Sequence, residues 1–160
     1  MRLAKAYPDG PLVFGNDAII AEFVRRRVPE VIDAGFGPCT TIGVIRGKKL
    51  LGGVIYHMYQ PAYKSVMVSY AFDSPKWISP EVIGSFAAFP FLQLGVNRLW
   101  TLTPRKNKRS RRLVEFLGFK LEGCARKGYG NDDAMIYGML KHECRWIKDE
   151  QEPASSARAA

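Results

Sequence analysis

The sequence predicts an α+β domain built on a mixed central β-sheet of about six to seven strands, flanked by helices. Apolar runs rich in β-branched residues occur between residues 40 and 73 and again near the end of the chain. Segments with helical spacing separate these runs, and the sequence contains no internal repeat. The expected order is αβββαβαββα, with a crossover helix before and after a strand at residues 98–103.

The first predicted helix begins at Asn16 or Asp17, because either side chain can cap a helix. Its apolar side chains recur at i, i+3 and i+4 spacing, which is typical of a helix with one buried face. Three consecutive arginines, residues 25–27, lie at its exposed end. We expect this helix to end near Pro29.

Residues 40–73 predict three antiparallel strands in meander order. Two apolar runs within residues 40–60 flank Gly47, a composition typical of a hairpin. A third run begins at Ser65, after Pro61, and completes the meander.

The hydrophobic period becomes helical after Ser79, which we expect to cap a helix that has Pro80 in its first turn. Pro90 lies further along the same segment. Because proline lacks a backbone N–H and clashes with the preceding turn, Pro90 is expected to kink or shorten this helix.

The C-terminal half predicts a strand, a helix, two more strands and a short final helix. The first of these helices begins at Asn107 and ends at Gly118, which occupies the position of a C-cap glycine. In chain order, the expected segments are residues 98–103, 107–118, 119–126, 133–140 and 142–148.

Length and composition predict one domain, which we assign to residues 1–148, because 160 residues with 47% hydrophobic side chains suffice for one core. The polar tail, residues 149–160, is expected to be disordered. Three cysteines and two histidines without a CxxC pair argue against a disulfide framework and against a metal site. The apolar stretches are too short to span a membrane, so we expect a soluble, cytoplasmic protein.

The positive charge of the chain is concentrated in one segment. Six of the eight residues at 105–112 are Lys or Arg, and they supply most of the net charge of +9. A solvated helix face, a small anionic ligand and a nucleic acid are all compatible with such a cluster. No aromatic side chain interleaves with these basic residues, which disfavours single-stranded RNA.

From Asn107 to Arg126 the sequence follows the pattern N-x-x-S-x-x-L-x-x-x-L-G-F-x-x-E-G-x-x-R. This pattern resembles the C-terminal half of the GCN5-related N-acetyltransferase (GNAT) superfamily, especially the branch that acetylates ribosomal-protein amino termini. The resemblance implies a GNAT-type sheet that binds acetyl-coenzyme A (acetyl-CoA) as co-substrate in a V-shaped gap between the strands at residues 65–73 and 98–103. It also implies direct transfer of the acetyl group to an amine in a ternary complex.

The resemblance assigns cofactor-binding roles to five residues at two places. Ala71 and Phe72 end the third meander strand and would offer backbone groups to the pantetheine arm and the acetyl carbonyl, where an N–H stabilises an oxyanion. Asn107 matches the asparagine that contacts the cofactor in the family, and a plain helix cap is its other interpretation. Arg109 and Ser110 would reach the phosphates of the cofactor.

The segment that would bind the pyrophosphate departs from the family pattern. Relatives carry a glycine-rich loop there, whereas the stretch KWISPEVIG has no glycine before Gly84. The side chain of Ser79 and the backbone amides of Trp77 and Ile78 are the donors left at this helix start. Pro80 has no N–H to donate.

The usual proton-transfer residues of the family are also replaced. Relatives often carry a Glu before the asparagine and a Tyr seven residues after it, and the corresponding residues here are Leu102 and Val114. His57 is the candidate catalytic residue, and a histidine with one structural hydrogen bond is its alternative interpretation. The amine could also lose its proton to water, since an α-amino group is partly neutral at pH 7. Tyr70 and Tyr137 fit better as core or rim aromatics.

An N-acetyltransferase is therefore the main hypothesis from the sequence. The alternatives are a non-catalytic acyl-CoA-binding domain and a nucleic-acid-binding domain that uses the basic residues 105–112. The expected acceptor is a small-molecule or peptide amine, with no membrane partner and with nucleic acid possible but not favoured. The protein is expected to be a monomer or a homodimer.

Overall fold

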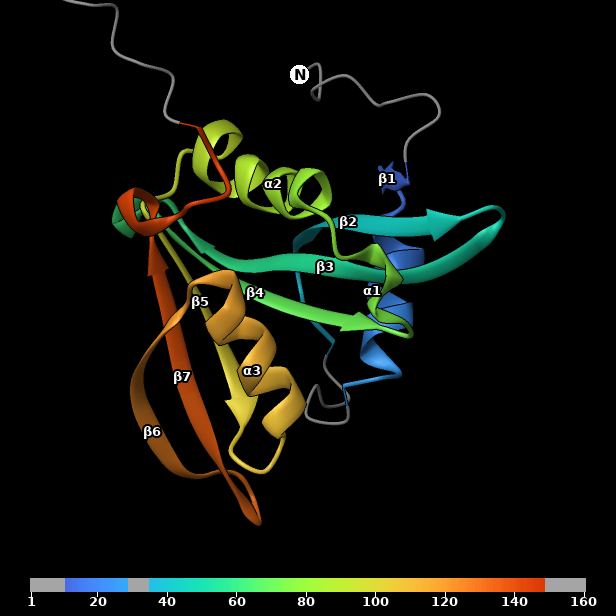
Figure 1. Ribbon diagram of the computed structural model, residues 1–160. Coiled ribbons are helices and arrows are strands. Elements are labelled where there is room, and N and C mark those ends of the chain that lie inside the picture. The colour runs from blue at the N-terminus through green and yellow to red at the C-terminus, as the bar shows by residue number, and fades with distance from the viewer. Residues whose placement is uncertain (1–10, 29–34, 149–160) are drawn as a thin grey trace, which may run out of the picture.

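The computed structural model describes residues 11–28 and 35–148, which form a seven-stranded mixed sheet with three α-helices (Figure 1). The strand order across the sheet is β1-β2-β3-β4-β5-β7-β6. The strands are β1 (Leu12–Phe14), β2 (Cys39–Arg46), β3 (Lys49–Gln60), β4 (Ser65–Phe72), β5 (Arg98–Pro104), β6 (Lys120–Tyr129) and β7 (Asp132–Leu140). The helices are α1 (Asp17–Arg25), α2 (Pro80–Ala88) and α3 (Lys108–Leu117).

The helices cover opposite faces of the sheet. Helix α1 packs on β2 and β3, where Ile20 lies against Gly43 and Gly53. Asp17 Oδ1 accepts hydrogen bonds of 2.8 Å from the backbone N–H and the hydroxyl of Thr41. Helices α2 and α3 lie on the other face (Figure 1). The sheet thus forms the middle of three layers.

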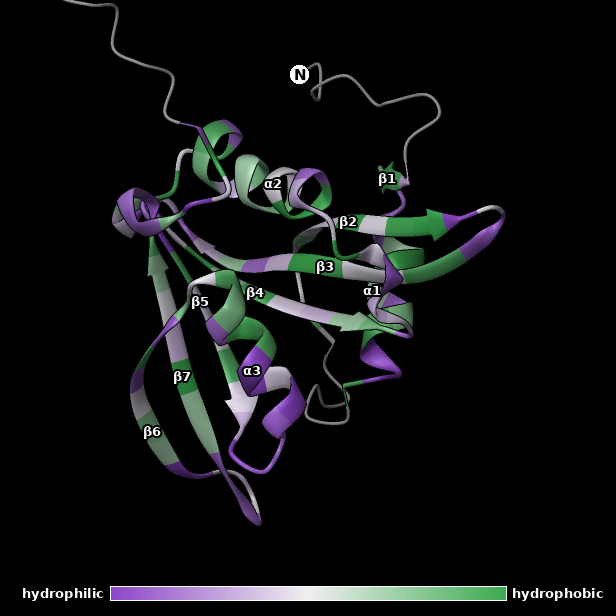
Figure 2. Cartoon of the chain, in the orientation of Figure 1, coloured by the Kyte–Doolittle hydropathy of each residue, from purple (hydrophilic) through white to green (hydrophobic). Residues whose placement is uncertain are grey.

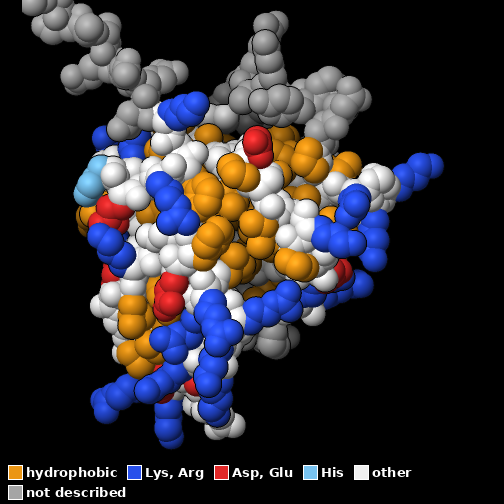
Figure 3. All heavy atoms as spheres, in the orientation of Figure 1, with side chains coloured by type: hydrophobic (Ala, Val, Ile, Leu, Met, Phe, Trp, Pro, Cys, Tyr) orange, Lys and Arg blue, Asp and Glu red, His pale blue; other side chains and the backbone are white. Residues whose placement is uncertain are grey.

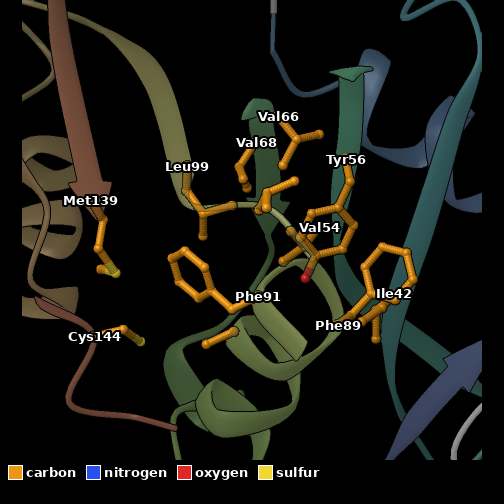
Figure 4. Close-up of a cluster of buried hydrophobic side chains, with 12 residues drawn as sticks. Ile42, Val54, Tyr56, Val66, Val68, Phe89, Phe91, Leu99, Met139 and Cys144 are labelled. Atoms are coloured by element: carbon orange, nitrogen blue, oxygen red, sulfur yellow. The ribbon is translucent and has the colours of Figure 1, made fainter. Parts of the chain in front are cut away.

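The core lies between the sheet and the chain from α2 to β5. Figure 4 shows side chains of β3, β4, β5 and β7 converging on Phe89 and Phe91. The rings of Tyr56 and Phe89 are 4.9 Å apart, and the Tyr56 hydroxyl donates to the carbonyl of Phe86 at 2.6 Å. This contact fixes α2 against the middle of the sheet.

All neighbouring strands are antiparallel except β4 and β5, which are parallel. These two strands pair over only three residues, from Ser65 with Arg98 to Met67 with Trp100. Beyond Met67 the strands separate, and β5 continues to pair only with β7. The divergence opens the sheet at the carboxyl ends of β4 and β5.

The α+β class and the order of the main elements agree with the sequence expectation. Asn107 caps α3, accepting a hydrogen bond of 3.0 Å from the Ser110 N–H, and Gly118 ends the helix in the left-handed conformation with φ of 103°. The expected effect of Pro90 is also confirmed, because α2 ends at Ala88 and a π-helical turn, Phe89–Gln93, follows it.

Three details differ from the expectation. Strand β1 was not predicted, since three residues are too few to show a period of two. Helix α1 ends at Arg25, before the expected end near Pro29, and Pro29 itself lies outside the described residues. The predicted final helix over 142–148 is only a 3₁₀ turn, Lys141–Glu143, because Trp146 packs against α2 and α3 instead of continuing a helix.

The expected disordered tail, residues 149–160, lies outside the described residues. In the described part of the chain, none of the helices combines the length and the hydropathy needed to cross a membrane.

Gly52 on β3 lies opposite Phe72 of β4, and Phe72 lines the opening between β4 and β5. A Cβ atom at Gly52 would meet the ring of Phe72 and would lie 2.5 Å from the carbonyl oxygen of Ala71. We expect Gly52→Ala to lower the free energy of unfolding by about 1–3 kcal/mol, because the backbone must move to relieve this overlap. Urea denaturation measures the effect.

Gly123→Ala is the matched control, because its Cβ would make only an ordinary contact of 3.6 Å with Ile136. We expect it to be neutral or to stabilise by about 0.4–1 kcal/mol. Equal destabilisation by the two substitutions would contradict the packing described at Gly52.

Candidate active site

A cleft with a volume of about 740 Å³ occupies the opening between β4 and β5. Its wall is formed by the residues after α1, the end of β3, the second half of β4 with the following loop, β5, and the first turn of α3. Eight of the nine site residues predicted from the sequence line it, namely His57, Ala71, Phe72, Trp77, Ile78, Asn107, Arg109 and Ser110. The ninth, Ser79, lies outside the lining.

Strand alternation gives the cleft two chemically different sides. On β4, Tyr70 and Phe72 point to the face covered by α2 and α3, where both pack against the core. Ser69 points to the face covered by α1, together with His57 of β3. The opening therefore connects an aromatic side under the two helices with a more polar side under α1.

The backbone of β4 also has two different edges. The N–H of Asp73 donates to the Leu51 carbonyl of β3 at 2.8 Å, and the register continues without a shift to Met67. By the alternation of an antiparallel ladder, Ala71 exchanges hydrogen bonds with β3, whereas Tyr70 and Phe72 direct their N–H and C=O groups to the other edge. No described residue of β5 pairs with that edge beyond Met67.

The first turn of α3 is the most basic part of the cleft. It carries Lys108, Arg109 and Arg111 and no acidic residue, although the helix dipole favours negative charge at this end. Lys and Arg side chains gather over this end of α3 and the β6–β7 hairpin in Figure 3, and the same region is hydrophilic in Figure 2. A bound anion would relieve the unfavourable electrostatic energy of this turn.

The first turn of α2 is less suited to an anion. Of the three predicted donors, the Ile78 N–H already donates to the Pro75 carbonyl at 3.1 Å, and the Ser79 hydroxyl is held at the helix start by accepting from the Val82 N–H at 3.2 Å. Glu81 adds a negative charge to the same turn.

Trp77 lies in the loop for which the GNAT resemblance implied glycines. Its ring is buried and stacks on Phe72, with the ring centroids 4.0 Å apart and an interplanar angle of 18°. This stack closes the cleft toward α2. Trp77 is thus an apolar anchor for the loop before α2.

His57 is a buried histidine on the α1 side. Its Nε2 atom lies 2.9 Å from the Ser69 hydroxyl, and its ring meets Phe36 edge-on at 5.1 Å. Burial lowers the pKa of His57 to about 4, because the protonated ring loses hydration. His57 is therefore neutral at pH 7 and only weakly basic.

Tyr70 is a core aromatic at the wall of the cleft, as the sequence predicted. Its hydroxyl lies 2.6 Å from the Ser110 hydroxyl and joins β4 to the first turn of α3 at the cleft. Burial raises the pKa of Tyr70 to about 12, so the phenol keeps its proton at neutral pH. Tyr137 does not line the cleft, and its hydroxyl contacts Arg111 and Glu115.

An ion pair at the mouth of the cleft was missed. Arg27 donates to both carboxylate oxygens of Asp73, at 2.6 and 2.9 Å, and its guanidinium stacks over the Phe23 ring. The Arg27 hydrogen bonds lower the pKa of Asp73. The sequence could not have paired these residues, which lie 46 positions apart and meet only through the packing of α1 on the sheet.

The low pKa of His57 predicts a specific acid response. The unfolded state takes up a proton at His57 near pH 6.5, whereas the folded state does so only near pH 4, so this group makes stability fall as the pH drops through that window. We expect the His57 ring signals in NMR to titrate near pH 4. We expect His57→Gln to lose the corresponding part of the pH dependence of unfolding.

A His142→Gln variant removes the other histidine, which is exposed, and so assigns the signals. A His57 titration midpoint at pH 6 or above would contradict the burial described here.

No protein-family model matches the sequence, and no curated protein does. The fold is similar to solved structures of acetyltransferases. One point mutant of spermidine N-acetyltransferase SpeG from Vibrio cholerae has a TM-score of 0.65 at 14% identity, over 81% of this chain and 94% of that chain. For another SpeG mutant the values are 0.59 and 17%, over 66% of each chain. A candidate acetyltransferase from T. thermophilus has a TM-score of 0.57 at 24% identity, over 67% of this chain and 61% of that chain.

This chain thus spans about two thirds of the length of two of these relatives. At such identities the likeness concerns the fold, and none of the three is described as a ribosomal-protein acetyltransferase, so that branch stays a prediction. Taken with the sheet order and the opening between β4 and β5, the comparisons show that the chain has the α+β fold of the GNAT acetyltransferases.

Proposed function

We propose that this chain is an N-acetyltransferase that transfers the acetyl group of acetyl-CoA to an amine by direct attack in a ternary complex. The observation that carries the proposal is the free edge of β4, where Tyr70 and Phe72 direct backbone groups into a cleft that ends at the basic turn of α3. An N–H on this edge can stabilise the oxyanion that forms when an amine attacks a thioester carbonyl. Ala71 then serves as a lining residue, because its own backbone groups face β3.

We assign the phosphates of the donor to the start of α3. Arg109 and Ser110 line the cleft there, Asn107 holds the turn in place, and Arg109 makes no ion pair with a described residue. The start of α2 is a poorer site, since the Ile78 N–H is engaged in the fold and Glu81 would repel a phosphate. In this respect the donor site would differ from the glycine-rich loop of relatives.

Acetyl transfer from a thioester to an amine requires few proton transfers by the protein's own side chains. The amine must be neutral to attack, and the departing thiolate must gain a proton. With a pKa of about 4, His57 can orient a neutral amine through a hydrogen bond more readily than it can deprotonate an ammonium ion. Water would then take the proton of the acceptor, and the rate should rise with pH toward the pKa of the amine.

Nucleic-acid binding is the less favoured function. Part of the basic cluster is already paired, because Arg105 forms an ion pair with Asp133 at 3.2 Å, and the carboxylate of Asp132 lies beside it, held by the backbone N–H of Lys106 at 2.9 Å. A non-catalytic acyl-CoA-binding domain would differ from the proposed enzyme only in turnover, since Leu102 and Val114 supply no proton-transfer group.

The donor assignment predicts the effect of Arg109→Ala. Loss of a charge-assisted contact to phosphate should weaken acetyl-CoA binding about 10- to 100-fold, measured by calorimetry at fixed salt. Arg112→Ala is the control, because Arg112 is exposed on the same helix but does not line the cleft. Equal acetyl-CoA affinities for the two variants would place the phosphates elsewhere. If acetyl-CoA binds but no free thiol is released with any amine of a test panel, the chain is a non-catalytic domain.

The charges of the cleft predict the class of acceptor. Asp73 is the one carboxylate among the described lining residues, and Arg27 already pairs with it. A polyamine would place several positive charges beside Arg27 and Arg109 without an available counter-charge. We expect kcat/KM for an uncharged or singly charged primary amine to exceed that for spermidine by at least about 10-fold.

Arg27→Gln should narrow this difference, because it releases the Asp73 carboxylate. A wild-type preference for spermidine would contradict the assigned charge pattern.

A further inference from the structure

An apolar cavity of about 60 Å³ lies between the sheet and helices α2 and α3. Its inner wall includes Val68, Ala87, Leu99, Val114, Met139 and Cys144. Protein interiors are usually packed without voids of this size, because each void forfeits dispersion contacts. The cavity is therefore a candidate binding space in its own right.

The cavity and the cleft are neighbours, because five residues line both: Tyr70, Phe72, Trp77, Thr101 and Leu113. Two of these residues, Tyr70 and Phe72, are those whose backbone groups face the proposed position of the thioester. The shared side chains separate the two spaces, so a chain attached to the thioester carbonyl would reach the cavity by passing between them. Hydrophobic side chains fill the surface between α2 and α3 above it (Figure 3).

The polar side chains around the cavity are hydrogen-bonded within the protein. The Tyr56 hydroxyl donates to the Phe86 carbonyl, the Tyr70 hydroxyl bonds to Ser110, and the Trp146 Nε1–H donates to the Leu117 carbonyl at 2.8 Å. No buried side-chain N or O atom of the described residues lacks a hydrogen-bond partner. A water molecule in the cavity would find few partners, so the space favours an apolar occupant.

We propose that this cavity holds the acyl chain of a thioester donor longer than acetyl, a proposal that rests on the acyltransferase function proposed above. The space accommodates about four methylene-sized groups, on the basis of about 15 Å³ for one water-sized group. The preferred donors are therefore short-chain acyl-CoA thioesters such as butyryl-CoA. The amine nitrogen attacks the acyl carbonyl, the C–S bond breaks, and the coenzyme A thiolate takes up the proton that the amine releases.

The first test measures dissociation constants for coenzyme A, acetyl-CoA, propionyl-CoA, butyryl-CoA and octanoyl-CoA by calorimetry. Each methylene that enters the cavity should tighten binding about fourfold, so butyryl-CoA should bind about 15-fold more tightly than acetyl-CoA. Octanoyl-CoA should gain nothing further, since its chain exceeds the space. Equal affinity for acetyl-CoA and butyryl-CoA would overturn the inference.

The second test fills the cavity. Ala87→Leu adds bulk to its wall and should abolish the preference for butyryl-CoA while leaving acetyl-CoA affinity within about twofold. Ala88→Leu is the matched control, because Ala88 is the next residue of α2 and does not line the cavity, so the chain-length preference should persist. If Ala87→Leu does not fold, Val68→Ile is the milder substitution, and it should reduce the preference about fourfold.

The two proposals fail in different ways. If acetyl-CoA binds and is turned over but butyryl-CoA shows no advantage, only the cavity inference is wrong. If neither coenzyme A nor any of its thioesters binds, the proposed function is wrong, and the cavity inference with it.

Discussion

The separation of β4 from β5 after three residue pairs is the constraint on which the rest of the site depends. Backbone N–H and C=O groups need partners, so the free edge of β4 must be paired by water, a polar side chain or a ligand. Because the two strands are parallel, their carboxyl ends open at the same place, and the loop after β4 and the start of α3 arrive there together. The early end of the β4–β5 pairing thus places backbone hydrogen-bond donors of β4 beside the basic first turn of α3.

The charges around the opening are distributed unevenly, and this decides what it can bind. Arg27 neutralises Asp73 at the mouth of the cleft, and Asp133 partly neutralises Arg105 outside the cleft. Arg109, which lines the cleft, has no described ion-pair partner. An anion is therefore expected at the first turn of α3, whereas at α2 the acidic Glu81 stabilises the helix start and the apolar Trp77 anchors the preceding loop.

The sequence predicted the fold well where local signals agree with tertiary packing. Asn107 and Gly118 bound α3 because capping is a local property, and Pro90 interrupts its helix for a local reason. The final helix was wrongly predicted because Trp146 is held by a hydrogen bond to Leu117, 29 residues away, which no local pattern reveals. The pair of Arg27 with Asp73 and the contact of Tyr70 with Ser110 escaped prediction for the same reason.

The alternation of side chains along β4 separates the proposed donor side of the cleft from the proposed acceptor side. Even-numbered residues such as Val68 and Tyr70 face α2 and α3, where the proposed acyl chain would lie, whereas Ser69 faces His57 and α1, where an acceptor would approach. Substitutions on the first face should therefore change the selection of the donor, and substitutions on the second should change the handling of the amine. Because one strand holds both faces rigidly, the reacting atoms can meet at its edge without a conformational change in the sheet.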